Sequence, residues 1–528
     1  MKTVLFALNG SYSHTNLAVR AIGAHLADFG IQTVIIEKSL KDTRLSVLES
    51  LVREAADVYG FSVYIWNVNE MMQFASEVHA LLPKAKIVFG GPEVSFENES
   101  FFESHPYIDH IITGEGEEAF PALCKALADG KEIPKIIMPM PYADFSESGI
   151  YYDRIGERPH GLVYYESVRG CPFSCAYCLS SVTEGIRAKT LEKTLDDLLR
   201  FEQFDGIRTV KLVDRTFNFN KERAKAIWRA LSSDAYTKEY HFEVSAALLD
   251  AESFEILRNA PKGKFRLEIG VQSTNPDTVS AVDRRLDTEK TLNALKTLHE
   301  HHNLHLHADL IAGLPYEDFT RFGKSFDDIY GICDVLQLGF LKLLKGSKMR
   351  RDAEKYGIVY SPYPPYQVLK TNELSFSDIT RLHAIDAMND RFSNSGKFDH
   401  TFPYLPLASG SAFGFFDGLR DFAEEKFSCT EIARLPQTEA FRLIFAYAQT
   451  LANVNIEEVR ERLALDFLLG ETRRLPDFLH THTVSAEEKR DVLTRVPANI
   501  RAGCEVVRFP WLAETPVIVD RVGRRMIK

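Results

Sequence analysis

Cysteine is scarce in this sequence, and the few cysteines are not arranged as a disulfide framework. The chain has 7 cysteines among 528 residues, too few and too unevenly spaced to staple a small secreted fold. Cys124, Cys333, Cys429 and Cys504 are scattered, as small buried apolar residues usually are. The other cysteines all fall within residues 171–178, and such clustering indicates a metal site.

Long apolar runs and an excess of positive charge are also missing. No stretch approaches the roughly 20 apolar residues that span a bilayer, and residues 1–14 are typical of a first strand rather than of a signal peptide. The formal net charge of -11 argues against a large phosphate-binding surface, so nucleic acid is not an indicated partner. We therefore expect a cytoplasmic protein that acts on a small molecule or a peptide.

The chain is too long for one hydrophobic core, so a modular α/β protein is expected. Short β-rich runs alternate with amphipathic helical runs through most of it, as in parallel sheets. We predict a doubly wound Rossmann-like domain at residues 1–135, a proline-containing linker at 136–160, a partial (β/α)6 barrel at 161–365 and a mainly α-helical domain at 366–528.

The predicted strands follow from short runs of β-branched and aromatic residues. In the first domain they cover residues 4–8, 32–37, 58–64, 86–89 and 110–113. In the barrel they cover residues 163–167, 209–213, 241–245, 266–270, 305–311 and 335–343. In the last domain the apolar periodicity predicts helices at 377–391, 438–451, 455–469 and 486–494.

The expected carboxyl ends of the strands in the first domain carry unusual residues. Ligands of doubly wound sheets bind beyond these ends, and glycines there let the backbone approach a bulky ligand. The same turns are equally consistent with tight turns of a plain flavodoxin-like domain. The residues concerned are Ser11, Tyr12, Ser13, Ser62, Tyr64, Trp66, Asn67, Gly90, Gly91, Pro92, Glu93, Gly114, Glu115 and Gly116.

The clustered cysteines, Cys171, Cys175 and Cys178, follow the first predicted barrel strand, where active-site loops belong. Three thiolates in one short loop can each bind a different iron of a [4Fe–4S] cubane and leave the fourth iron without a protein ligand. A structural zinc would require a fourth Cys or His at short spacing, and the next histidine is His241. The spacing therefore favours a cluster over zinc.

The Cys-x3-Cys-x2-Cys spacing, with Tyr177 before the last cysteine, resembles the signature of the radical S-adenosylmethionine (SAM) superfamily. The resemblance implies that the open iron binds SAM and that one electron cleaves SAM to a 5′-deoxyadenosyl radical. It also implies an external one-electron reductant of the flavodoxin or ferredoxin type, and it assigns no catalytic residue. The residues expected to contact SAM are Phe173, Tyr177, Asp214, Glu243, Glu268, Gln272 and Ser273.

The first domain resembles the cobalamin (B12)-binding domain that precedes many radical SAM barrels, through the turns at residues 90–93 and 114–117. The strand-end residues named above are then the expected cobalamin contacts. The Asp-x-His-x-x-Gly loop of many cobalamin proteins is absent, because Tyr12 stands two residues before His14 and Leu17 three residues after it. His14 is therefore not expected to bind cobalt. Trp66 is expected either to cover the lower face of the cofactor or to pack as an ordinary aromatic residue.

These resemblances imply a cobalamin-dependent radical SAM enzyme. We expect a methyltransferase that uses the 5′-deoxyadenosyl radical and methylcobalamin to methylate an unactivated carbon. One alternative keeps the cofactors but catalyses a rearrangement, cyclisation or redox step, and another is a non-enzymatic cobalamin or iron–sulfur sensor. The last domain resembles an extension found in one bacterial subgroup, and we expect it to close the mouth of the barrel and shape the substrate pocket.

Overall fold

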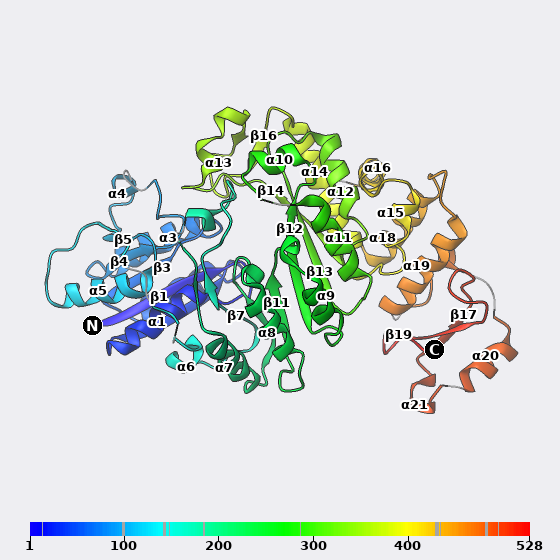
Figure 1. Cartoon of the computed structure of the whole chain (residues 1–528), viewed down its shortest axis with the longest axis horizontal. Coiled ribbons are helices and arrows are strands. Elements are labelled where there is room, and N and C mark those ends of the chain that lie inside the picture. The colour runs from blue at the N-terminus through cyan, green and yellow to red at the C-terminus, as the bar shows by residue number, and fades with distance from the viewer. Residues whose placement is uncertain are drawn as a thin grey trace.

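The computed structural model describes the whole chain except residues 13, 98–100, 141–143, 147, 183–184, 286, 428–431, 433, 472, 481–483, 495 and 528. Figure 1 shows an N-terminal sheet with its helices, a central open barrel and a largely helical C-terminal part, following one another across the molecule. Among the described residues, no helix is both long and apolar enough to cross a membrane.

The N-terminal domain is built on a six-stranded parallel sheet in the order β2-β1-β3-β4-β5-β6. This order confirms the predicted doubly wound fold. The strands are β1 (Lys2–Asn9), β2 (Gln32–Ser39), β3 (Val58–Ser62), β4 (Lys86–Gly90), β5 (His110–Ile112) and β6 (Ile136–Ile137). The helices are α1 (Leu17–Asp28), α2 (Arg44–Arg53), α3 (Val68–Leu81), α4 (Phe101–Ser104) and α5 (Gly116–Ala128).

Alternation along β1 explains why helices cover both faces of this sheet. Phe6 and Leu8 belong to a buried cluster with residues of α2 and α3, whereas Leu5 and Ala7 belong to a second cluster with residues of α1 and α5. Successive side chains of a strand point to opposite faces, so a continuous apolar run needs a helical layer on each side.

The segment predicted as a linker contains regular structure. Ile136 and Ile137 form β6, which pairs in parallel with β5 and extends the first sheet beyond residue 135. The short helix α6 (Tyr151–Ile155) then packs against α1. The predicted linker therefore begins with a strand of the first sheet, which a two-residue run without periodicity did not reveal.

The central domain is an open barrel of six parallel strands in the order β14-β13-β12-β11-β10-β7, as predicted. Its strands are β7 (Gly161–Tyr165), β10 (Ile207–Leu212), β11 (Glu239–Glu243), β12 (Phe265–Gln272), β13 (His305–Ala312) and β14 (Val335–Phe340). The helices between them are α7 (Leu191–Glu202), α8 (Lys221–Leu231), α9 (Ala251–Arg258), α10 (Pro276–Ala281), α11 (Thr288–His299) and α12 (Phe319–Ile329). A small antiparallel hairpin, β8 (Val168–Arg169) with β9 (Arg187–Ala188), follows β7.

The barrel helices begin where a short polar side chain caps the first turn. Thr190, Asn220, Asp250, Asp287 and Asp318 each accept a hydrogen bond from a backbone N–H three residues later. Such caps satisfy donors that the helix itself leaves unpaired. They fix each helix start, and with it the length of the loop that follows the preceding strand.

The C-terminal part is mainly helical, as predicted, but it also contains short strands. The short helix α13 (Lys348–Arg351) follows β14 within the barrel domain. The helices of the C-terminal part are α14 (Phe376–Met388), α15 (Leu405–Ala408), α16 (Ala412–Glu424), α18 (Gln437–Ala448), α19 (Ile456–Gly470), α20 (Ala486–Thr494) and α21 (Ala498–Arg501). The strands β15 (Val359–Tyr360) and β16 (Val368–Lys370) form one hairpin. The strands β17 (Cys504–Val507), β18 (Val517–Asp520) and β19 (Arg525–Ile527) form an antiparallel sheet that the sequence did not predict.

The C-terminal part covers the barrel edge formed by β14. The Nδ2 atoms of Asn389 and Asn394 donate to the backbone oxygen of Leu336 at 2.6 and 2.9 Å, and the Leu336 N–H donates to Asn394 Oδ1 at 3.2 Å. Side chains thus replace the hydrogen bonds that a neighbouring strand would supply, which removes an exposed sheet edge.

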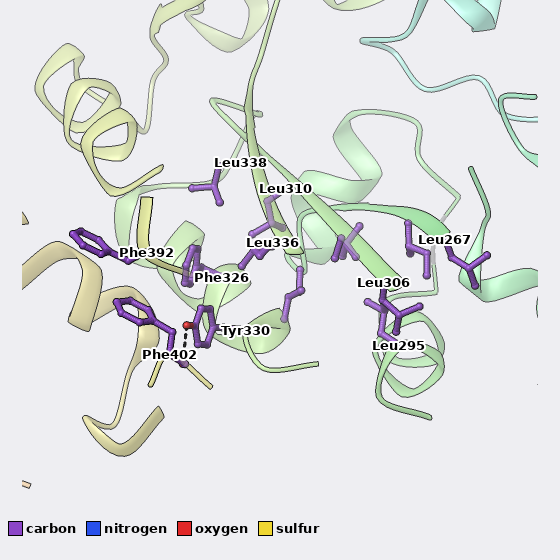
Figure 2. Close-up of a cluster of buried hydrophobic side chains, with 14 of the residues drawn as sticks. Leu267, Leu295, Leu306, Leu310, Phe326, Tyr330, Leu336, Leu338, Phe392 and Phe402 are labelled. Carbon is purple, nitrogen blue, oxygen red and sulfur yellow. Dashed lines mark hydrogen bonds between the residues drawn. The ribbon is translucent and has the colours of Figure 1, made fainter. Parts of the chain in front are cut away.

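Apolar packing joins the same two parts. Figure 2 shows Phe326 of α12 and Tyr330, which directly follows this helix, lying against Phe392 and Phe402, while the barrel leucines extend away on the other side. The Tyr330 hydroxyl donates to the Phe402 backbone oxygen at 3.0 Å. The barrel and the C-terminal helices therefore share one continuous core.

Candidate functional site

The three clustered cysteines lie in a loop that hairpin β8–β9 closes. Arg169 pairs directly with Arg187 in this hairpin, and the cysteines fall between them. Gly170, the next residue, has φ +98, and a Cβ atom there would lie 2.2 Å from the Gly185 backbone oxygen. Only glycine permits so close an approach at a positive φ.

Backbone hydrogen bonds hold the centre of the cysteine loop. The Cys178 N–H donates to the Cys175 oxygen at 3.0 Å. Ala176 donates to the Val282 oxygen at 2.9 Å and accepts from the Met349 N–H at 2.8 Å. The loop is therefore attached to segments that follow β12 and β14, both at the carboxyl ends of the barrel strands.

Cys171, Cys175 and Cys178 line one cavity of about 230 Å³ at this end of the barrel. Among the described residues, no three Cys, His, Asp or Glu side chains converge as the ligands of a single metal ion would. Thiolates that bind different irons of a cubane stand around it rather than around one point. Of the predicted SAM contacts, the cavity is lined by Phe173, Tyr177, Glu243, Glu268 and Gln272.

Arg284 is a cavity residue that the sequence did not single out. Its Nη1 lies 3.6 Å from the Cys175 sulfur and donates to the Tyr177 hydroxyl at 3.0 Å. Burial raises the pKa of the Cys175 thiol, and the Arg284 cation acts in the opposite direction. This guanidinium therefore favours the thiolate form that iron binds.

The acidic groups of the cavity differ in the direction in which their pKa values are shifted. Burial raises the pKa of Asp309 to about 7 and also raises that of Glu243. Burial would raise the pKa of Glu268 too, but His241 and Lys211 outweigh it and hold that pKa at about 2. Glu268 is thus already paired, with Lys211 Nζ at 2.8 Å, whereas the carboxyl group of Asp309 accepts no hydrogen bond from a described residue.

Two predicted SAM contacts lie outside the lining of this cavity. Asp214 is fully buried and accepts from the backbone N–H groups of Ser167 and Val168 at 2.8 and 2.9 Å. Ser273 is also fully buried, and its hydroxyl donates to Glu317 at 2.6 Å. Both side chains support the backbone around the site instead of facing the cavity, because local partners satisfy them. Their contact with SAM stays a prediction, and in this structure neither side chain is part of the cavity lining.

The predicted cobalamin residues gather at the carboxyl ends of β1, β3, β4 and β5, except Ser13, which lies outside the described residues. Tyr64 and Trp66 stack with ring centroids 4.4 Å apart, and Trp66 is 48% exposed. Tyr12 is 66% exposed. These rings form an accessible aromatic surface beside the strand ends.

Several of the predicted cobalamin residues are engaged with protein groups. Asn67 is fully buried and donates to the Leu8 oxygen at 3.0 Å, so it ties neighbouring strand ends together. The carboxylates of Glu93 and Glu115 form ion pairs with residues of the central domain. Gly91, with φ +117, fits closely under Val63, whose oxygen would lie 2.4 Å from a Cβ at that position.

His14 also faces the barrel. Its Nδ1 lies 2.5 Å from the Tyr164 hydroxyl on β7, and the two rings are nearly parallel. Together with the ion pairs of Glu93 and Glu115, this contact shows that the carboxyl ends of both sheets face one another. Ligands bound at the two ends would lie next to each other.

Comparison with family models identifies the class. Residues 165–329 match the radical SAM superfamily, residues 4–124 match the B12 binding domain, and residues 354–501 match a family described as protein of unknown function (DUF4080). The chain is therefore a B12-binding-domain-containing radical SAM protein with a DUF4080 extension. The domain matches confirm the predicted cofactors: a [4Fe–4S] cluster, SAM and cobalamin.

Curated relatives include methyltransferases. The cobalamin-dependent radical SAM methyltransferase TokK of Streptomyces tokunonensis is 27% identical over 318 residues, which is 54% of this chain and 45% of TokK. The 2-(S-pantetheinyl)-carbapenam-3-carboxylate methyltransferase of Streptantibioticus cattleyicolor is 28% identical over 54% of this chain and 45% of its own length. The chain thus matches less than half the length of these two relatives.

Solved structures support the fold. The cobalamin-dependent radical enzyme OxsB, with aqua-cobalamin and SAM bound, superposes with a TM-score of 0.59 at 15% identity, over 88% of this chain and 78% of OxsB. The methyltransferase TsrM from Kitasatospora setae, with cobalamin and a [4Fe–4S] cluster, gives 0.54 at 17% identity, over 69% of this chain and 82% of TsrM.

Proposed function

We propose that this protein is a cobalamin-dependent radical SAM methyltransferase acting on a carbon centre that polar chemistry does not activate. The observation that carries the proposal is the facing arrangement of the two strand ends, one with three cysteines around a cavity and the other with the glycine turns of a B12-binding domain. A methyl donor at one end and a radical generator at the other would then act on one substrate between them.

We assign the cluster to Cys171, Cys175 and Cys178, with Arg284 as a cation that favours their thiolates. When bound, the cluster would cleave SAM to a carbon radical and cobalamin would carry the transferred methyl group. The protein holds the three thiols on a loop fixed at both ends. Three thiolates would bind three irons of the cluster and leave the fourth iron open to SAM.

We assign SAM contacts to cavity groups that still have hydrogen-bonding capacity. The Gln272 Oε1 atom is buried without a hydrogen-bond partner among the described residues, and Asp309 and Glu243 have carboxyl groups directed into the same lining. A polar ligand with hydroxyl and ammonium groups would satisfy these atoms, as buried polar groups require. Phe173 and Tyr177 supply apolar surface beside them.

For cobalamin, we propose that the backbone of the turns at residues 90–92 and 114–116 lies against the cofactor, with Tyr12, Tyr64 and Trp66 as its aromatic contacts. The partnership of His14 with Tyr164 supports the prediction that His14 is not a cobalt ligand. The reductant is proposed to be an external flavodoxin or ferredoxin, and the site of action the cytoplasm.

We also propose domain boundaries that follow the sheets. The cobalamin domain would run from residue 1 to the end of β6, the connector from there to residue 160, the barrel from 161 to 365 and the extension from 366 to 528. The parallel pairing of β6 supports the first boundary.

The test uses anaerobically reconstituted protein, a chemical reductant and SAM with an isotope-labelled methyl group. We expect 5′-deoxyadenosine to form and the label to appear on cobalamin. Cys175→Ala should lose both the iron and the 5′-deoxyadenosine while retaining cobalamin, and Cys333→Ala is the matched control because that cysteine lies away from the cavity. Formation of 5′-deoxyadenosine with no label on cobalamin or product would refute methyl transfer and support a rearrangement, cyclisation or redox step.

A further inference from the structure

The hairpin that closes the cysteine loop places two positive charges opposite each other. Arg169 and Arg187 are direct cross-strand partners in β8 and β9, and the hairpin has only one further pair, Val168 with Ala188. Like charges directly opposite each other destabilise a pair of strands. Glu166 already pairs with Arg169 at 2.6 Å, so a hairpin this short still needs an outside group that compensates the charge of Arg187 opposite it.

Glu115 of the N-terminal domain is that group. Its Oε2 lies 2.9 Å from Arg169 Nη1, and its Oε1 accepts from Arg187 Nη2. Arg169 is also paired with Glu117, at 2.9 Å. Both guanidinium groups lie over the buried ring of Phe145, at 4.9 and 5.8 Å from its centroid. We call this set of residues the Glu115 clasp.

The other glycine turn reaches the centre of the same loop. Glu93, which is 4% exposed, pairs with Lys345 Nζ at 2.9 Å and accepts from the Tyr366 hydroxyl. Lys345 lies four residues before Met349, whose N–H holds the Ala176 oxygen at 2.8 Å. We call Glu93, Lys345 and Tyr366 the Glu93 clasp.

We propose that Glu93 and Glu115 are positioning residues through which the N-terminal domain holds the cysteine loop in its cluster-binding shape. The Glu115 clasp fixes the base of the loop and the Glu93 clasp fixes the segment that supports its centre. Both carboxylates stand within two residues of the glycine turns at 90–91 and 114. For the proposed cobalamin site, a shift of either turn would move a carboxylate that holds the cluster loop, so the two cofactor sites would be coupled in both directions.

The structural claim is tested without turnover, on the full-length protein. Hydrogen–deuterium exchange of peptides covering residues 168–182 and the iron content after anaerobic desalting are compared for wild type, Glu115→Gln and Glu118→Gln. Glu118 is a matched control because it lies in the same first turn of α5 and pairs with no described cation. Because a charge-assisted hydrogen bond is lost, we expect exchange to be about tenfold faster and iron to be depleted in Glu115→Gln alone.

A second variant separates positioning from general damage. In the double variant Glu115→Gln with Arg187→Gln, Arg169 no longer faces a like charge and keeps Glu117 and Glu166 as partners, so exchange of the hairpin should return toward the wild-type rate. A purely structural defect would instead become worse with a second substitution. For the Glu93 clasp, Tyr366→Phe removes one donor to Glu93 and should accelerate exchange in the peptide containing Ala176.

The proposal is overturned if Glu115→Gln and Tyr366→Phe both exchange at the wild-type rate, or if the double variant is worse than Glu115→Gln. These readouts require neither SAM cleavage nor methyl transfer, although the link to cobalamin rests on the proposed function. If the exchange results hold and no labelled methyl group is transferred, the proposed function fails and the positioning role stands. Coupling between the two sites is measured separately, by comparing hydrogen–deuterium exchange of residues 168–182 with and without cobalamin. We expect cobalamin to slow this exchange in the wild type and not in Glu115→Gln.

Discussion

Replacing Gly170 by alanine should remove the cluster without unfolding the protein. Gly170 precedes Cys171 and has φ +98, a conformation that costs a residue with a Cβ about 1–2 kcal/mol. The added Cβ would also lie 2.2 Å from the Gly185 oxygen, a backbone atom in the opposite arm of the loop. The arms would have to separate by about 1 Å to restore ordinary contact, which a hairpin of two residue pairs does not tolerate.

The matched control is Gly185→Ala. Gly185 also has a positive φ, +74, but a Cβ there meets no atom within 4 Å. The control therefore carries the backbone strain of about 1–2 kcal/mol without the collision. We expect Gly170→Ala to cost about 2–5 kcal/mol in closing the loop, because overpacking adds about 1–3 kcal/mol to the strain of about 1–2 kcal/mol.

The assay is iron per chain after anaerobic reconstitution and desalting, together with 5′-deoxyadenosine formed from SAM under a chemical reductant. Gly170→Ala should lose most of its iron and all measurable cleavage, while Gly185→Ala should keep most of both. The thermal midpoint of both apoproteins should stay near that of wild type, because the hairpin lies outside the main core clusters. Equal iron retention in the two variants would refute the assigned close approach at Gly170.

Three further changes test the electrostatics and the packing around the site. The pKa of Asp309 is raised from 3.8 to about 7. Its charged form therefore opposes folding increasingly above pH 3.8 and fully above about pH 7. Asp309→Asn should thus raise the urea midpoint of the apoprotein near pH 8 and not near pH 4. An unchanged midpoint at both pH values would mean that Asp309 is not destabilised by burial. Arg284→Met should lower the midpoint potential of the cluster by on the order of 100 mV, because a cation near Cys175 favours the reduced form. The potential is measured by redox titration with electron paramagnetic resonance. Arg284→Lys should keep a potential near that of the wild type, and equal potentials in all three proteins would contradict this role of Arg284. Asn389→Ala should reduce the free energy of unfolding by about 1–3 kcal/mol, measured with urea, because it removes a buried donor to the Leu336 oxygen on the edge strand; a change below about 0.5 kcal/mol would show that solvent replaces this bond.

The order of strands and helices was predictable because it depends on local pattern. The helix predicted at residues 455–469 is α19, Ile456–Gly470, with Asn455 as its cap. The strand predicted at 163–167 is β7, Gly161–Tyr165, two residues earlier. That shift has a nonlocal cause, because Ser167 and Val168 donate their backbone N–H groups to Asp214 and so leave the sheet.

The missing elements lacked a local signal. The strand β6 has only Ile136 and Ile137, and it is defined by its pairing with β5. The sheet β17–β18–β19 consists of strands of three or four residues near the end of the chain. Runs this short fall below the length at which alternation is distinguishable from chance.

The site residues also divide into those with a local sequence signal and those that only the fold brings to the site. Phe173, Tyr177, Glu243 and Gln272 were predictable because each lies next to the cysteine motif or at a strand end, and the barrel brings such positions together. Arg284 was not, because it follows α10 and reaches Cys175 only through the fold. The hydrogen-bond partners of polar residues could not be predicted, because they depend on distant segments, as for Asp214 and Ser273.

At its start the extension contacts the cofactor domain, because the Tyr366 hydroxyl donates to Glu93. Its helical part, from α14 onward, lies on the opposite side of the barrel (Figure 1). Its described contacts run along β14 and α12, where Asn389 and Asn394 complete the strand edge and Phe392 and Phe402 pack against Tyr330 (Figure 2). The lining of the cysteine cavity, in contrast, comes from residues 171–309. Because the lining and the extension are separate, changes in the extension should alter the stability of the barrel more than SAM cleavage. Substrate selection should then be sought where the N-terminal domain faces the barrel.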